Sequence, residues 1–152
     1  MKINNNISDH IYELFEEFTQ KHRATLDGDF PNEYTIHYRC DCSLNECMQK
    51  NVGKEIIVNP KIVQLYNLNK EEVFACIAHE FGHIKDPLLN NHKDLVGREI
   101  AADEYACKLG YKQQMILVIK KFIANREILN FTDDEVENLK LRLQKLQQEE
   151  QK

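Results

Sequence analysis

The stretch from His79 to His83, which reads HEFGH, constrains this chain more than any other feature. It lies within residues 71–84, whose composition predicts a buried helix. Because an α-helix turns by about 100° per residue, the two histidines would share a face, about 6 Å apart along the axis. One metal ion could take a nitrogen from each, and Glu80 would lie beside the ion as a base acting on water. The alternative is a surface helix that carries two histidines by chance.

A second helical segment can supply what the histidine motif lacks. A catalytic zinc needs three protein ligands and one open position, so a third ligand must come from elsewhere in the chain. Glu99 can be that ligand, and fifteen residues separate it from His83. Asp103 follows one turn later on the same face, where it could accept a proton from a ligand histidine and orient its ring. Three alanines within 101–106 would allow close helix packing. The alternative is that both carboxylates are solvated on an outer face.

Together, HEFGH and the E-x-x-A-D-x-x-A pattern that begins at Glu99 resemble the gluzincin metallopeptidases. The resemblance covers about residues 55–109 and is greatest to the group of CAAX prenyl endopeptidases and bacterial heat-shock membrane proteases. Those proteases have several transmembrane helices, whereas the longest strongly apolar stretch here, 115–119, is far shorter than the roughly 20 residues of a membrane span. The chain is therefore more similar to the soluble, single-domain minigluzincins, and membrane-embedded substrates are not implied.

The resemblance implies a zinc-dependent endopeptidase that acts on peptide or protein substrates. Zn2+ would be bound by His79, His83 and Glu99, with Asp103 supporting a histidine. Glu80 would accept the proton of the attacking water and pass it to the departing amine. Tyr105, Tyr111 and His92 are candidates for a donor to the developing oxyanion, and the sequence does not choose among them.

Two other functions remain open. The pattern over residues 99–106 also resembles, less closely, the metallopeptidases of mobile elements that inactivate a repressor partner. The chain could instead be a zinc-binding module without hydrolytic activity. Glu80 speaks against that module, because a purely structural zinc site needs no base.

The predicted fold is a single α+β domain over residues 1–152 of the zincin type. A small mixed sheet would lie against the HEFGH helix, followed by a helical C-terminal part. Strands 34–39 and 55–59 could pair as a hairpin, and by resemblance the second strand or its neighbour would be the edge that binds a peptide backbone. The other expected elements are helices over 8–22 and 113–129, a turn region at 26–32, and a final helix from 133.

Glycine and leucine positions add two expectations about packing. Gly82 costs a helix interior about 1 kcal/mol relative to alanine, which predicts a close approach by a neighbouring element. The apolar residues Val136, Leu139, Leu143 and Leu146 recur at three- and four-residue steps in the final helix. They should pack on the domain's own core, with a homodimer seam as the alternative.

Composition limits the classes of partner and the cellular compartment that we expect for this protein. A net charge of −5 without a concentrated basic stretch argues against binding to nucleic acid. The N-terminal segment lacks the apolar run of a signal peptide, so we expect a cytoplasmic protein. The five cysteines are then free thiols, with Cys76 and Cys107 buried as small apolar residues. The cluster of Cys40, Cys42 and Cys47 could bind a second metal with His37 or form a redox pair, although unpaired loop thiols are the simpler interpretation.

Overall fold

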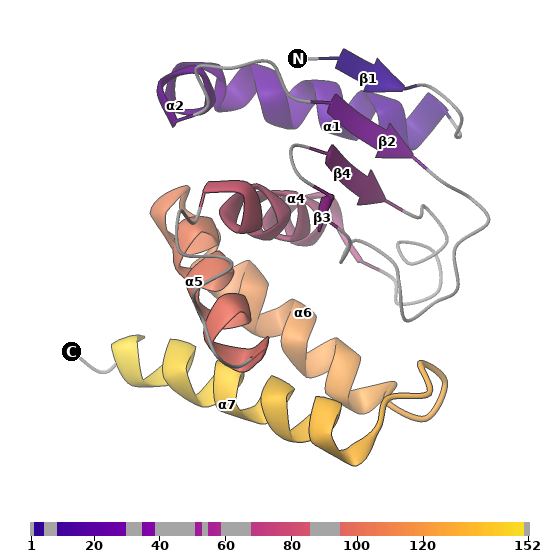
Figure 1. The fold of residues 1–152 in the computed structure, drawn as a ribbon, viewed down its shortest axis with the longest axis vertical. Coiled ribbons are helices and arrows are strands. Elements are labelled where there is room, and N and C mark those ends of the chain that lie inside the picture. The colour runs from indigo at the N-terminus through magenta and orange to yellow at the C-terminus, as the bar shows by residue number, and fades with distance from the viewer. Residues whose placement is uncertain are drawn as a thin grey trace.

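Helices make up most of the chain that the structure describes (Figure 1). The computed structural model describes residues 2–4, 9–29, 35–38, 51–52, 55–58, 68–85 and 95–150, with side chains over 13–29, 68–83 and 96–148. The helices are α1 (Asp9–Lys21), α2 (Arg23–Asp29), α4 (Lys70–Lys85), α5 (Leu95–Lys108), α6 (Lys112–Ala124) and α7 (Asp133–Glu150). The strands are β1 (Lys2–Asn4), β2 (Thr35–Tyr38), β3 (Asn51–Val52) and β4 (Glu55–Val58).

The strands pair in the order β1-β2-β4-β3. β2 is parallel to both β1 and β4, whereas β3 is antiparallel to β4. The two predicted strands are therefore confirmed as β2 and β4, but the predicted hairpin between them is wrong. A tight turn joins only antiparallel strands, and the long segment between Tyr38 and Glu55 permits the crossover that a parallel pair needs. β4 lies inside the sheet, and its neighbour β3 forms the edge.

The core of the described chain is built from helices around α4. This helix packs against α1, α5 and α6, and each of its residues from 72 to 83 is buried (Figure 1). The six helices account for most of the described residues, and the four strands contain only two to four residues each. The predicted α+β class is therefore wrong, because this is a helical fold.

Local hydrogen bonds define the ends of the helices that carry the site. Asn69 and Glu72 bond to each other's backbone N–H at 2.9 and 3.0 Å at the start of α4. Thr132 and Glu135 form the same capping box before α7, at 3.1 and 3.2 Å. Gly110, with a φ of +98°, ends α5 in the left-handed conformation that glycine adopts readily.

Two helix boundaries differ from those that the sequence predicts. The region 26–32 was expected to be a turn, but α2 extends through Asp29 after a break at His22. Leu26 is almost fully buried in the core, and its burial favours this additional helix over the turn. α6 ends at Ala124 rather than near 129, because the amide of Asn125 bonds back to the carbonyl of Lys121 and caps the helix.

The crossing of α4 and α5 depends on Gly82, as its place within a helix predicted. A Cβ atom at this position would lie 2.8 Å from both Cα and the carbonyl oxygen of Ala102, and 2.9 Å from Cβ of Tyr105. These separations are shorter than carbon atoms tolerate, so only glycine allows the present spacing. The small residues at the crossing therefore set the distance between the histidines of α4 and the carboxylates of α5.

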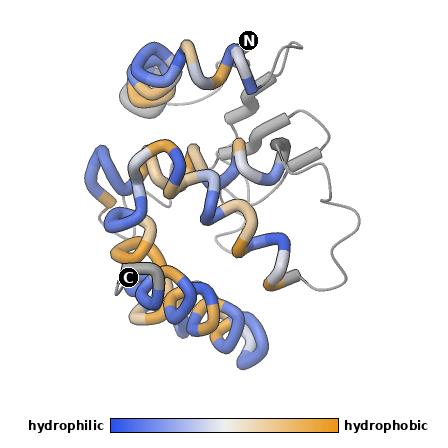
Figure 2. Tube along the Cα trace, turned by 90° about the vertical axis from the view of Figure 1, so that its left-hand side faces the viewer, coloured by the Kyte–Doolittle hydropathy of each residue, from blue (hydrophilic) through white to orange (hydrophobic). Residues whose placement is uncertain are grey.

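The apolar stripe of α7 packs within the molecule. Leu139 and Leu146 belong to the main core, Val136 is buried, and Leu143 packs against the core. Figure 2 shows hydrophobic and hydrophilic residues alternating along the turns of the C-terminal helices. The alternative of a homodimer seam loses the residues on which it rested. Among the described helices, none combines the length and the apolar character that crossing a bilayer requires.

Candidate metal centre

The HEFGH motif places three potential ligands in the interior of the protein. His79, Glu80 and His83 lie on α4, and each exposes 6% or less of its surface. One ligand atom from each residue lies within 4.8 Å of the others. The two imidazole rings are nearly perpendicular, with centroids 4.8 Å apart. Burial of three polar side chains is costly unless they have partners or bind an ion, so this cluster calls for a chemical explanation.

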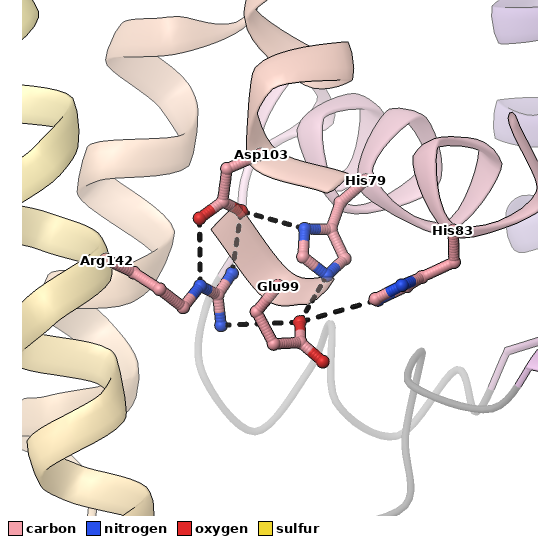
Figure 3. Close-up of polar contacts among 5 residues, drawn as sticks. All are labelled: His79, His83, Glu99, Asp103 and Arg142. Carbon is pink, nitrogen blue, oxygen red and sulfur yellow. Dashed lines mark hydrogen bonds and ion pairs between the residues drawn. The ribbon is translucent and has the colours of Figure 1, made fainter. Parts of the chain in front are cut away.

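α5 brings two carboxylates to the histidines (Figure 3). Oε2 of Glu99 lies 2.8 Å from Nε2 of His79 and 3.4 Å from Nε2 of His83. On the other side of the His79 ring, Nδ1 donates a hydrogen bond to Oδ1 of Asp103 at 2.8 Å. The structure thus brings together all five residues that the sequence singled out, and Asp103 takes the predicted place behind a histidine.

The distances from Oε2 of Glu99 to the two Nε2 atoms are close to those of a tetrahedral zinc site. Bonds of about 2.0–2.1 Å to zinc place tetrahedral ligand atoms about 3.3–3.4 Å apart. The separation between His83 and Glu99 has this value, and the hydrogen bond between His79 and Glu99 would have to lengthen by about half an ångström. Glu80 is the competing third ligand, because one of its oxygens belongs with both histidines to a set of atoms within 4.8 Å of one another. Glu99 is favoured because its Oε2 lies 2.8 and 3.4 Å from the two Nε2 atoms.

Glu80 carries a buried oxygen that no described residue satisfies. Its Oε2 atom is inaccessible and accepts no hydrogen bond from the described part of the chain. A buried acceptor without a donor is unfavourable by about 1–3 kcal/mol. The residue is therefore placed for a further polar partner within the site, as a base that acts on water would be.

The electrostatics of the site are those of strongly coupled buried groups. Burial would lower the pKa of His79, but Glu99 and Asp103 outweigh it and raise this pKa to about 10. Burial raises the pKa of Glu80 to about 8, and the charge of Glu99 adds to the shift. Burial would also raise the pKa of Glu99 and of Asp103. The nearby cations lower both instead, chiefly His79 for the first and Arg142 for the second.

The charges of this cluster balance when it receives two further positive charges. Glu80, Glu99 and Asp103 as carboxylates contribute −3 and Arg142 contributes +1, so the ionised groups sum to −2. Protons on His79 and Glu80 supply this charge in the metal-free protein. A divalent cation would supply the same charge without them, so the donor set also fits zinc electrostatically.

Sequence reasoning missed Arg142. This residue lies on α7 and is 8% exposed, and its guanidinium bonds to both carboxylate oxygens of Asp103. The missed signal is its position in the stripe, because Arg142 follows Leu139 by three residues and precedes Leu146 by four. A charged residue on the buried face of a helix needs a buried partner.

Two tyrosines considered as donors to an oxyanion are engaged elsewhere. The hydroxyl of Tyr105 donates to Asp29 at 2.8 Å, and the hydroxyl of Tyr111 shares a hydrogen bond with Nε2 of His22. Burial raises the pKa of Tyr111 to about 12, which keeps it protonated. The third candidate, His92, lies outside the described residues.

Two of the five cysteines have described side chains, and the other three lie outside the described residues. Cys76 is buried in the core, and Cys107 packs partly buried against it. The predicted burial is therefore confirmed for Cys76, whereas Cys107 is only partly buried. The cluster of Cys40, Cys42 and Cys47 lies outside the described residues, and the side chain of its potential partner His37 is not described.

Comparison of the chain with models of protein families, with curated proteins and with solved structures gives no match.

Proposed function

We propose that this protein is a zinc-dependent endopeptidase. The observation that carries the proposal is the position of Glu99, whose Oε2 atom lies within 3.4 Å of Nε2 of both His79 and His83. Glu80, whose Oε2 has no hydrogen-bond partner among the described residues, belongs to the same buried cluster. Two imidazoles, one carboxylate ligand and a separate carboxylate base are the groups that metal-assisted hydrolysis of a peptide bond requires.

Each residue has a distinct role in this proposal. His79, His83 and Glu99 would hold the ion, which when bound polarises the scissile carbonyl and lowers the pKa of water. Glu80 accepts a proton from the attacking water and returns it to the nitrogen of the departing amine. Its raised pKa of about 8 belongs to the metal-free protein, and a nearby cation favours the ionised form that a base needs.

The exposure of the ligands indicates the side from which a substrate approaches. The side chain of Glu99 is 33% exposed, whereas those of His79 and His83 are 8% and 7% exposed. A peptide would therefore reach the centre from the side of Glu99. Asp103, whose side chain is 3% exposed, lies behind His79 and would not contact substrate.

Zinc content and peptide cleavage test the proposal. The wild type should bind about one zinc per chain and cleave members of a broad peptide library. Glu80→Gln should retain the zinc and the fold but lose about 10²-fold or more in kcat, because the amide cannot accept the proton. Glu104→Gln removes an exposed carboxylate from α5 and is the matched control, with activity near that of the wild type.

Each other outcome selects a different function. A Glu80→Gln variant that retains turnover would exclude Glu80 as the base. A wild type that binds zinc tightly but cleaves no peptide would favour the non-hydrolytic module. Cleavage confined to one repressor-like protein would favour the regulatory peptidase. Absence of zinc binding by the wild type would reject the metal centre itself.

A further inference from the structure

Arg142 is a buried arginine beside the candidate site, and neither the motifs nor the resemblance assigns it a role. It reaches the site from α7, a helix that contributes no expected ligand. Its Nε donates to Oδ2 of Asp103 at 2.9 Å, and its Nη2 donates to Oδ1 at 2.8 Å. Its third nitrogen, Nη1, lies 3.8 Å from Oε2 of Glu99 (Figure 3). One guanidinium thus lies beside the carboxylates of both Asp103 and Glu99.

Arg142 and His79 share an acceptor. Oδ1 of Asp103 accepts from Nη2 of Arg142 and from Nδ1 of His79, each at 2.8 Å. The planar fork of a guanidinium fixes both oxygens of a carboxylate, which a single ammonium cannot do. With Asp103 held in this way, the proton of His79 stays on Nδ1 and the ring directs Nε2 toward Glu99 and His83.

We propose that Arg142 is a positioning residue of the metal centre. It acts through Asp103 to fix the tautomer and the orientation of His79, so that Nε2 faces the ion. The role rests on the proposed zinc site but not on peptide hydrolysis. It makes the C-terminal helix part of the centre, although that helix supplies no ligand.

The sign of the interaction between Arg142 and a bound cation distinguishes this positioning role from a purely electrostatic one. A positive guanidinium beside the site repels a divalent cation, so a residue that acted only through its charge would weaken zinc binding. Neutralising it would then tighten binding, and lysine would replace it without effect. A positioning residue predicts the opposite, because both substitutions lose the two-point contact with Asp103.

Zinc affinity of the full chain, measured by competition with a chelator, distinguishes the two cases. Arg142→Lys and Arg142→Met should each weaken binding by about 10–100-fold, the range typical of groups that orient a metal ligand. Lys140→Met is the matched control. It removes an exposed cation of α7 that pairs only with Glu137 among its described contacts, and it should leave the affinity unchanged.

A double variant covers the case in which Arg142→Met does not fold. Asp103→Asn/Arg142→Met removes both partners of the buried pair, so neither charge is left alone. If Arg142 acts through Asp103, the double variant should bind zinc no more than a few-fold more weakly than Asp103→Asn alone. Independent losses that multiply would overturn the proposed path through Asp103.

The proton on Nδ1 of His79 gives a second readout that does not depend on activity. In the zinc-loaded wild type it should give a downfield proton NMR signal, which His79→Ala identifies by its loss. Arg142→Lys should shift or broaden this signal, whereas Lys140→Met should not. Wild-type zinc affinity in Arg142→Lys together with an unchanged signal would overturn the proposal. Zinc binding by a wild type that cleaves no peptide would reject only the endopeptidase function, and absence of zinc binding would reject both.

Discussion

The two sides of α4 are equally buried but differ in chemistry. On one side, Phe74 and Phe81 pack against Phe18 of α1, with ring centroids 5.6 and 5.9 Å apart. On the other side, His79 and His83 meet the carboxylates of α5. All four side chains of α4 expose 6% or less of their surface. Burial by itself therefore does not separate the part of a helix that stabilises the fold from the part that carries the candidate site.

The difference lies in what burial costs. Removing an aromatic ring from water is favourable, and a fully buried phenylalanine contributes about 1.5–3 kcal/mol. Buried imidazoles and carboxylates are unfavourable unless hydrogen bonds and opposite charges compensate. The polar side has these compensations through Asp103, Glu99 and Arg142, yet Oε2 of Glu80 has no partner among the described residues. The aromatic side of α4 is explained by stability, whereas the polar side fits the ion binding that we propose.

Paired substitutions on the two sides should separate stability from metal binding. His79→Ala should abolish tight zinc binding, and its cost to the stability of the metal-free protein should shrink as pH rises toward 10, because the protonated ring supplies that stability. Phe81→Ala should lower the free energy of unfolding by about 3–5 kcal/mol because it leaves a cavity in the core. The zinc content of the folded Phe81→Ala protein should stay near that of the wild type. Denaturant unfolding with chelator and zinc analysis of the folded fraction measure the two effects.

The contrast between the two sides would be wrong if both substitutions changed zinc content and the free energy of unfolding in the same way. Loss of zinc from folded Phe81→Ala would mean that the aromatic side also determines the ligand geometry. Tight zinc binding by His79→Ala would remove this residue from the ligands.

Gly82→Ala should affect both sides at once, because Gly82 lies where α4 crosses α5. The added methyl group would lie 2.8 Å from backbone atoms of Ala102, so the helices must move apart. Overpacking of this kind costs about 1–3 kcal/mol, partly offset by the higher helix propensity of alanine. We expect lower stability and weaker zinc binding, since the carboxylates of α5 move with that helix.

Gly28→Ala is the matched control for this substitution. Gly28 lies in α2, and a Cβ atom there would meet no other atom within 4 Å. Only the gain in helix propensity remains, so stability should rise by up to about 1 kcal/mol and zinc binding should not change. An equal response of the two variants would mean that the close approach at Gly82 does not control the site.

The polar side alone should make the stability of the metal-free protein fall as pH rises. His79 and Glu80 have pKa values raised from 6.5 to about 10 and from 4.5 to about 8. The folded state then binds more protons than the unfolded chain. The contribution of His79 is complete below pH 6.5 and is lost through about pH 10, and that of Glu80 is complete below 4.5 and is lost through about 8. Between pH 7 and 8 we expect a loss of about 2 kcal/mol.

Denaturant unfolding at several pH values in the presence of chelator measures this loss. Glu80→Gln removes one of the two groups and should give a shallower dependence on pH. Saturating zinc should also reduce the dependence, because the ion replaces protons in the folded state. A stability that rises over this range would show that the site is not protonated in the way the charge balance requires.

Much of the candidate site could be predicted because its residues are related by helix geometry. The four-residue spacing of His79 and His83, and that of Glu99 and Asp103, fixes each pair on one face of a helix whatever surrounds it. Gly82 pointed to a close crossing because a glycine inside a helix needs a compensating reason. Short-range chemistry also set the start of α4, where Asn69 and Glu72 cap the helix.

The tertiary structure alone decided the fold class, the parallel pairing of β2 with β4, the helical conformation of α2 and the place of Arg142. Each depends on a partner distant in the sequence. Leu26 extends the helical region because it is buried in the core. Arg142 is tolerated on the buried face of α7 because the carboxylate of Asp103, 39 residues earlier, accepts two hydrogen bonds from its guanidinium. A periodic pattern specifies which face of an element is buried but not what will lie against it, because packing partners are chosen by the assembled core.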